Sequence, residues 1–244
     1  MAAQEAVEPV NALHLEIVAQ LEQVEQLRQR RLAAPDLARS VHALKSYQHR
    51  RFEKTYADLL ASPRYGPACR FFLEELYSPA DFTSRDQQFS RVVPALVRLF
   101  PHRVVETVAR LARLHALSER LDLQMADAGG RPEQVDARTY VQAWRSVGEP
   151  RSREEQIQAM LAIGHALDGF TRLPMLRRML HAMRGPARAA RLEALQGFLE
   201  RGFDTFADMK GAREFLLTVE QRERRLAGLL SGSEDLARFR DELA

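Results

Sequence analysis

Apolar residues recur at helical spacing from the start of the chain. Polar residues such as Glu16 and Gln20 separate the members of the first stripe, and this pattern predicts a helix from Pro9 to about Arg31. The stripe consists of Leu13, Ile17, Leu21, Val24 and Leu27. Pro35 fits the first turn of a second helix with its own apolar set. The short connection predicts that the chain begins with a long antiparallel helical hairpin.

The same periodicity continues to the C-terminus, broken by glycine and proline. It predicts helices over 68–77, 83–99, 101–128, 135–147, 152–170, 173–183, 186–201 and 211–230, with a terminal turn at 234–243. No segment shows the alternation of a strand. We therefore expect an all-α fold, a multi-helix bundle of roughly eight to ten helices. We expect one domain over 1–244, with a subdomain joint near 129–133 as the alternative.

Composition narrows the class of protein. The chain has 36 basic residues, of which only three are lysines, Lys45, Lys54 and Lys210, and the other 33 are arginines. It also has 33 acidic residues, so the net charge is +3. Cys69 is the single cysteine, so an internal disulfide is excluded. We interpret Cys69 as a small buried hydrophobic residue rather than a nucleophile. Residues 1–9 lack a signal-peptide pattern, and no apolar run is long enough for a membrane span. We expect a cytoplasmic protein without a membrane partner.

Short catalytic and metal-binding motifs are absent from the sequence. It contains no Glu-x-x-His, His-Glu-x-x-His, Cys-x-x-Cys, Walker A or Gly-x-Ser-x-Gly pattern. We therefore assign no catalytic residue, no metal ligand and no cofactor. Two alternatives stay open: His165 with Asp168 as an acid–base pair, and His165 or His115 as a haem ligand between helices.

The first candidate site surrounds a proline turn that joins two predicted helices. Asp81, Arg85 and Asp86 follow the aromatic run at 71–72 and would gather at a helix N-terminus, where backbone N–H groups also bind anions. The structural alternative is stronger. In that interpretation Thr83 and Asp86 cap the helix, and Arg85 pairs with a nearby carboxylate.

The second candidate site is the cluster between Arg172 and Arg191, because residues 169–192 contain no acidic side chain. Its members are Arg177, Arg178, His181, Arg184 and Arg188. Guanidinium groups clustered on neighbouring turns could hold a small anion or a nucleic-acid phosphate. The small net charge does not favour nucleic acid, and the alternative is an amphipathic hairpin whose arginines extend into solvent.

One long segment resembles a known sequence signature. The run FFLEELYSPADFTSRDQQFSRVVPALVRLFP at 71–101 is similar to a signature of an uncharacterised family of proteobacterial proteins, loosely FFLxxLYxPxDFxxRD. The segments 114–118, 183–188 and 198–203 resemble the same family, so the similarity extends from about residue 35 to about residue 225. It implies a bacterial, mostly helical protein and carries over no activity or site residue.

Three functional hypotheses follow. The first is a non-catalytic interaction or regulatory protein that binds a protein partner, or itself, through the apolar stripe of the N-terminal hairpin. The second is a helical sensor that binds a small anionic ligand at the Arg172–Arg191 cluster. The third is an all-α enzyme or haem-binding protein that lacks a short motif.

Overall fold

The computed structural model describes residues 2–75, 78–80 and 82–232, with side chains from residue 12 onward. This part of the chain contains helices and no strand, which confirms the all-α class. The helices are α1 (Ala2–Leu32), α2 (Pro35–Thr55), α3 (Ala57–Ala61), α4 (Gly66–Glu75), α5 (Thr83–Leu99), α6 (His102–Ala128), α7 (Ala137–Val147), α8 (Pro150–Thr171), α9 (Pro174–Ala182), α10 (Arg184–Ala189), α11 (Glu193–Asp208) and α12 (Arg213–Ser231). The turn expected at 234–243 lies outside the described residues.

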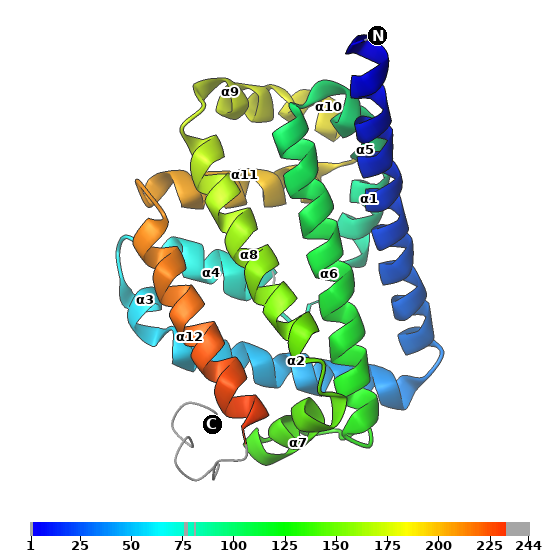
Figure 1. The fold of residues 1–244 in the computed structure, drawn as a ribbon, viewed down its shortest axis with the longest axis vertical. Coiled ribbons are helices and arrows are strands. Elements are labelled where there is room, and N and C mark those ends of the chain that lie inside the picture. The colour runs from blue at the N-terminus through cyan, green and yellow to red at the C-terminus, as the bar shows by residue number, and fades with distance from the viewer. Residues whose placement is uncertain (1, 76–77, 81, 233–244) are drawn as a thin grey trace.

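Two long helices, α6 and α8, run side by side through the middle of the bundle (Figure 1). Helix α1 lies along the outer side of α6, and α12 lies along α8. Helices α2 and α7 cross one end of this layer, while α9 and α10 lie at the other end. The bundle thus surrounds an interior bounded by helices that are far apart in the sequence.

The antiparallel hairpin predicted for α1 and α2 does not form along their length. Helix α1 packs against α6 and α5, whereas α2 turns away from it and crosses the end of α6 (Figure 1). The physical reason is the shape of α6, where Ala109, Ala112 and Ala116 are almost completely buried and present a row of small side chains. Small side chains allow the axes of α1 and α6 to approach closely.

The apolar stripe of α1 is part of the core. Ile17 is 0% exposed, Leu21 and Val24 are also buried, and Ile17 and Leu21 share a cluster with Val93 of α5 and Val105 of α6. The expectation that this stripe is a partner-binding or self-association face is therefore wrong. Its apolar surface is already covered by the chain itself.

The N-terminus of α5 differs from the predicted capping box. The helix begins after Phe82, and no side chain caps it with a hydrogen bond at that position. Asp86, the predicted capping carboxylate, is instead buried and bonded to groups on other helices. Pro94 lies within α5, which continues to Leu99.

The two helices on either side of the segment near 129–133, α6 and α7, pack against each other. Met125 of α6 lies in the same apolar cluster as Tyr140 and Trp144 of α7. Asp136 caps α7, since its side chain accepts a hydrogen bond of 2.7 Å from the Thr139 backbone N–H.

Among the described residues, no helix combines the length and the apolarity that crossing a lipid bilayer demands.

Candidate functional site

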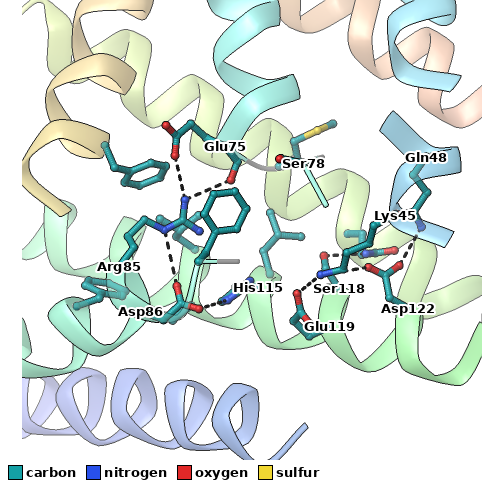
Figure 2. A pocket seen from close by; sticks show the side chains of 18 of the residues that line it. Lys45, Gln48, Glu75, Ser78, Arg85, Asp86, His115, Ser118, Glu119 and Asp122 are labelled. Carbon is teal, nitrogen blue, oxygen red and sulfur yellow. Dashed lines mark hydrogen bonds and ion pairs between the residues drawn. The ribbon is translucent and has the colours of Figure 1, made fainter. Parts of the chain in front are cut away.

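A cavity of about 240 Å³, partly open to solvent, lies between α2, α5, α6, α8 and α11 (Figure 2). Side chains from α1, α4, α7 and α12 complete its wall. Folded proteins rarely contain voids much larger than a water molecule, and an engineered apolar cavity of about 150 Å³ already takes up benzene. A cavity of this size therefore has room for an organic molecule larger than one aromatic ring.

The lining of the cavity changes in polarity along α6. Val108, Leu111 and Leu114 form the first part, His115 follows, and Ser118, Glu119 and Asp122 form the last part. With a rise of about 1.5 Å per residue, this succession covers about 20 Å of helix. Aromatic and aliphatic residues complete the apolar part, namely Phe82, Phe89, Val92, Leu96, Leu195, Phe198 and Leu199. The polar part is completed by Lys45, Gln48, Arg51, Tyr140, Trp144, Arg153, Gln156 and Glu223.

Asp86 is the centre of the first polar cluster, where the two parts of the cavity meet. Its Oδ2 accepts a hydrogen bond from Arg28 Nη2 at 2.6 Å and lies 3.2 Å from His115 Nε2. Arg85 Nε is 3.7 Å from its Oδ1. Burial by itself would raise the pKa of Asp86, but the hydrogen bond with His115 and the charges around it outweigh burial and lower the pKa. Asp86 is therefore a carboxylate that fixes the His115 ring.

Arg85 joins α5 to α4 beside this cluster. Its Nη1 donates to the Glu75 carbonyl oxygen at 3.2 Å and to Glu75 Oε2 at 3.1 Å (Figure 2). The guanidinium also lies over two rings, 4.1 Å from the centre of Phe82 and 4.7 Å from that of Phe198. Glu75 is held from the other side by Arg201 of α11. The interpretation that Arg85 pairs with a nearby carboxylate is confirmed.

The second polar cluster lies one to two turns further along α6. His115, Glu119 and Asp122 are spaced i, i+4 and i+7, which places them on one helix face. Lys45 Nζ of α2 bonds to Glu119 and lies 3.9 Å from Asp122 Oδ2 (Figure 2). Gln48 Nε2 donates to Asp122 Oδ1 at 2.9 Å.

Burial acts on the two carboxyl groups of this cluster with different results. For Glu119 burial favours a higher pKa, but the charge of Lys45 and other cations outweigh it, so the pKa is lowered. For Asp122 burial is the dominant cause and raises the pKa, although Lys45 opposes the shift. Glu119 is thus the acceptor that stays charged, and Asp122 holds a proton more readily.

Arg153 of α8 lies in the polar part of the cavity and is 6% exposed. Its Nη1 donates to Gln156 Oε1 at 3.2 Å, its Nη2 to the Met125 sulfur at 3.0 Å, and its guanidinium lies 3.9 Å from the centre of the Trp144 ring. Its Nε has no hydrogen-bond partner, and no carboxylate of the described residues lies within 4.0 Å of the guanidinium. Burial lowers the pKa of Arg153.

The structure separates the residues that the sequence grouped as candidates. Arg85 and Asp86 both line the cavity, while Asp81 lies outside the described residues. The Arg172–Arg191 cluster lies on the outer surface around α9 and α10. There Arg184 makes a two-pronged ion pair with Glu200, at 2.7 Å and 2.8 Å, and Arg177 lies 3.3 Å from Asp204.

The remaining members of that cluster differ in exposure. Arg178 and Arg188 are exposed, and His181 is half-buried. Because carboxylates of α11 neutralise two of the arginines, the positive charge of this surface is smaller than the acid-free segment suggested. Small-anion binding at this surface stays a prediction.

Two other sequence interpretations are decided by burial. Cys69 is fully buried, and burial raises the pKa of its thiol to about 12, so it is a packed hydrophobic side chain rather than a nucleophile. His165 is exposed on α8, and the carboxylate of Asp168 bonds to Arg172 and to the Ala212 backbone N–H. His115, the second haem-ligand candidate, faces the cavity and Asp86 (Figure 2).

Sequence reasoning missed Lys45, Glu119, Asp122 and Arg153 as site residues. A signal was available in α6, where three ionisable residues, His115, Glu119 and Asp122, are spaced i, i+4 and i+7 and so share one helix face. Lys45 was not among the predicted site residues, yet it is half-buried in the cavity. Nothing in the local sequence around Arg153 distinguishes it from the exposed arginines.

Comparisons with known proteins give one family match. No curated protein and no solved structure matches the chain. Within the described residues there is also no group of three or more histidine, cysteine, aspartate or glutamate side chains placed to hold a metal ion. A family model described as "Domain of unknown function (DUF8198)" matches residues 26–235, which include every residue that lines the cavity except Leu21 of α1. The chain therefore belongs to the DUF8198 family.

Proposed function

We propose that this protein binds a small amphiphilic molecule in this cavity. The observation that supports the proposal is the gradient of the lining along α6, from leucine and valine to serine, glutamate and aspartate. A mostly apolar pocket with a few convergent polar groups is the usual form of a small-molecule site. The apolar body of the ligand would lie against α5 and α11, and its polar end would face α2 and α8.

This proposal replaces partner binding through the N-terminal hairpin, because the stripe on which that hypothesis rested is buried. It keeps the idea of a helical sensor but moves the site from the surface arginines to the interior. The ionisable side chains around the cavity support this move, since buried charged groups are rare and are retained mainly where they are paired or functional.

The test fills the cavity and measures binding. Leu114 lines the apolar part, so Leu114→Trp places a large ring in the space of the ligand. We expect calorimetric titration with 4-phenylbutan-1-ol to give saturable binding to the wild type and none to Leu114→Trp. The matched control is Arg110→Trp, an exposed position of the same helix, which should bind as the wild type does. Absence of wild-type binding, or equal binding to Leu114→Trp, refutes the proposal.

A second candidate function is an acid–base reaction on the bound molecule. The supporting observation is the contact of His115 with Asp86, which fixes one ring nitrogen and leaves the other for proton transfer. The test compares small molecules consumed from a cell extract by the wild type and by His115→Gln. A compound that disappears only with the wild type supports catalysis, and identical extracts contradict it.

A further inference from the structure

Arg153 is a buried cation that the protein itself leaves incompletely bound. It is 94% buried, yet its charge is met by an amide oxygen, a sulfur and the face of an indole ring rather than by a carboxylate of the described residues. Buried arginines are normally paired with an acidic group, and thioether sulfur is a weak acceptor. An acidic partner from outside the chain would complete this site.

The carboxyl groups near Arg153 contact other cations. The polar part of the cavity holds three cations, Lys45, Arg51 and Arg153, and three carboxyl groups, Glu119, Asp122 and Glu223. Lys45 bonds to Glu119 and lies 3.9 Å from Asp122 Oδ2, and Arg51 Nη1 lies 3.8 Å from Glu223 Oε1. Arg153 is the cation of this group that has no carboxylate of the described residues within 4.0 Å. A carboxylate of a ligand would supply this missing partner.

The guanidinium of Arg153 is held in place but keeps unused donor capacity. Its Nε has no hydrogen-bond partner, and its Nη2 is bonded to the Met125 sulfur, which is a weak acceptor. Another arginine of this protein, Arg184, binds both oxygens of the Glu200 carboxylate at 2.7 Å and 2.8 Å. Trp144 lies against the face of the Arg153 guanidinium, which holds its plane in place.

We infer that the guanidinium of Arg153 binds the carboxylate of the ligand, so that the ligand is a small organic carboxylate with an apolar body. The inference rests on the proposed function and specifies its ligand class. A carboxylate is favoured over a phosphate monoester because Glu119, Asp122 and Glu223 surround the site and repel a second negative charge.

The experiment uses three probes with the same phenylalkyl body: 4-phenylbutanoate, 4-phenylbutan-1-ol and 3-phenylpropyl phosphate. By calorimetric titration we expect the wild type to bind the carboxylate about tenfold to a hundredfold more tightly than the alcohol, the usual effect of a hydrogen bond to a charged group. Arg153→Gln should lose this preference and keep the affinity for the alcohol. Arg113→Gln, which removes an exposed arginine already paired with Glu16, should bind all three probes as the wild type does.

The outcomes separate the inference from the function on which it rests. Equal wild-type affinities for the carboxylate and the alcohol, or an equal loss of both in Arg153→Gln, overturn the role of Arg153 and leave the cavity function standing. Tighter binding of the phosphate overturns the ligand class, and no binding of any probe overturns the proposed function. If Arg153→Gln does not fold, Arg153→Lys keeps the charge but lacks the planar set of donors, and its carboxylate affinity should fall while that for the alcohol stays.

Discussion

Replacing Ile17 by alanine tests the packing of α1 against the rest of the bundle. Ile17 is 0% exposed and lies in the cluster formed with α5 and α6. The substitution removes three carbon atoms, which at about 0.8 kcal/mol for each buried methylene corresponds to about 2.4 kcal/mol of transfer free energy. The space left behind adds to this cost, so we expect the free energy of unfolding to fall by about 3 to 4 kcal/mol.

The assay is urea and thermal unfolding followed by circular dichroism. For a chain of this size, about 2 to 4 °C of melting temperature is lost for each kcal/mol, so the midpoint of Ile17→Ala should fall by about 6 to 16 °C. Leu15→Ala is the matched control, since Leu15 belongs to the same helix and is 69% exposed; its effect should stay within about 0.5 kcal/mol. An unchanged melting temperature together with altered self-association in sedimentation would show that the stripe is a partner face after all.

Further predictions concern helix contact and buried carboxyl groups. A Cβ at Gly164 would lie 2.5 Å from the buried Leu216 side chain, so Gly164→Ala should lower the urea midpoint by the equivalent of about 1 to 3 kcal/mol. The control is Gly169→Ala, where a Cβ would have no atom within 4 Å, and it should be neutral or stabilising. Asp122 has a raised pKa in the folded state, so its ionisation costs stability as the pH rises. In urea unfolding, Asp122→Asn should therefore gain stability relative to the wild type between about pH 4 and pH 7. A stability difference between the two proteins that does not change with pH would contradict this. Asp86 has a lowered pKa, so its contribution to stability is present above the usual value of 3.8 and is lost as the pH falls below it. Asp86→Asn should lower the free energy of unfolding by about 3 kcal/mol near pH 7, and this loss should shrink in acid. A loss that is independent of pH would refute the ion-pair explanation.

The local parts of the fold followed from the sequence because their causes are local. Pro35 begins α2, and Gly129 ends α6, as the conformational preferences of proline and glycine predict. The direction in which α2 leaves α1 did not follow, because it depends on which faces of α6 and α7 cover the apolar residues of each helix. A short connection limits the distance between two helix ends but does not set the angle between their axes.

The candidate site was predictable only in part for the same reason. Arg85 and Asp86 stood out through their position after a proline turn, yet the role of Asp86 depends on Arg28, 58 positions earlier in the chain, and on His115, 29 positions later. A capping box explains the same residue types by local bonding, so the sequence pattern favoured a capping role for Asp86 that the structure does not show. Arg153 shows the limit most clearly, since only its burial distinguishes it from arginines that lie in solvent.

The burial of Cys69 provides a built-in reporter of motion in this protein. It is the single cysteine, it is 0% exposed, and it lies in the cluster that joins α4 to α11 and α12. A thiol reagent can therefore modify the chain only in molecules whose α4 region has opened, and the labelling rate at low reagent concentration measures the free energy of that opening. A ligand that binds only the closed form slows labelling in proportion to its occupancy. Unidentified compounds can thus be screened against this protein through its own thiol, without a dye or an assay of activity.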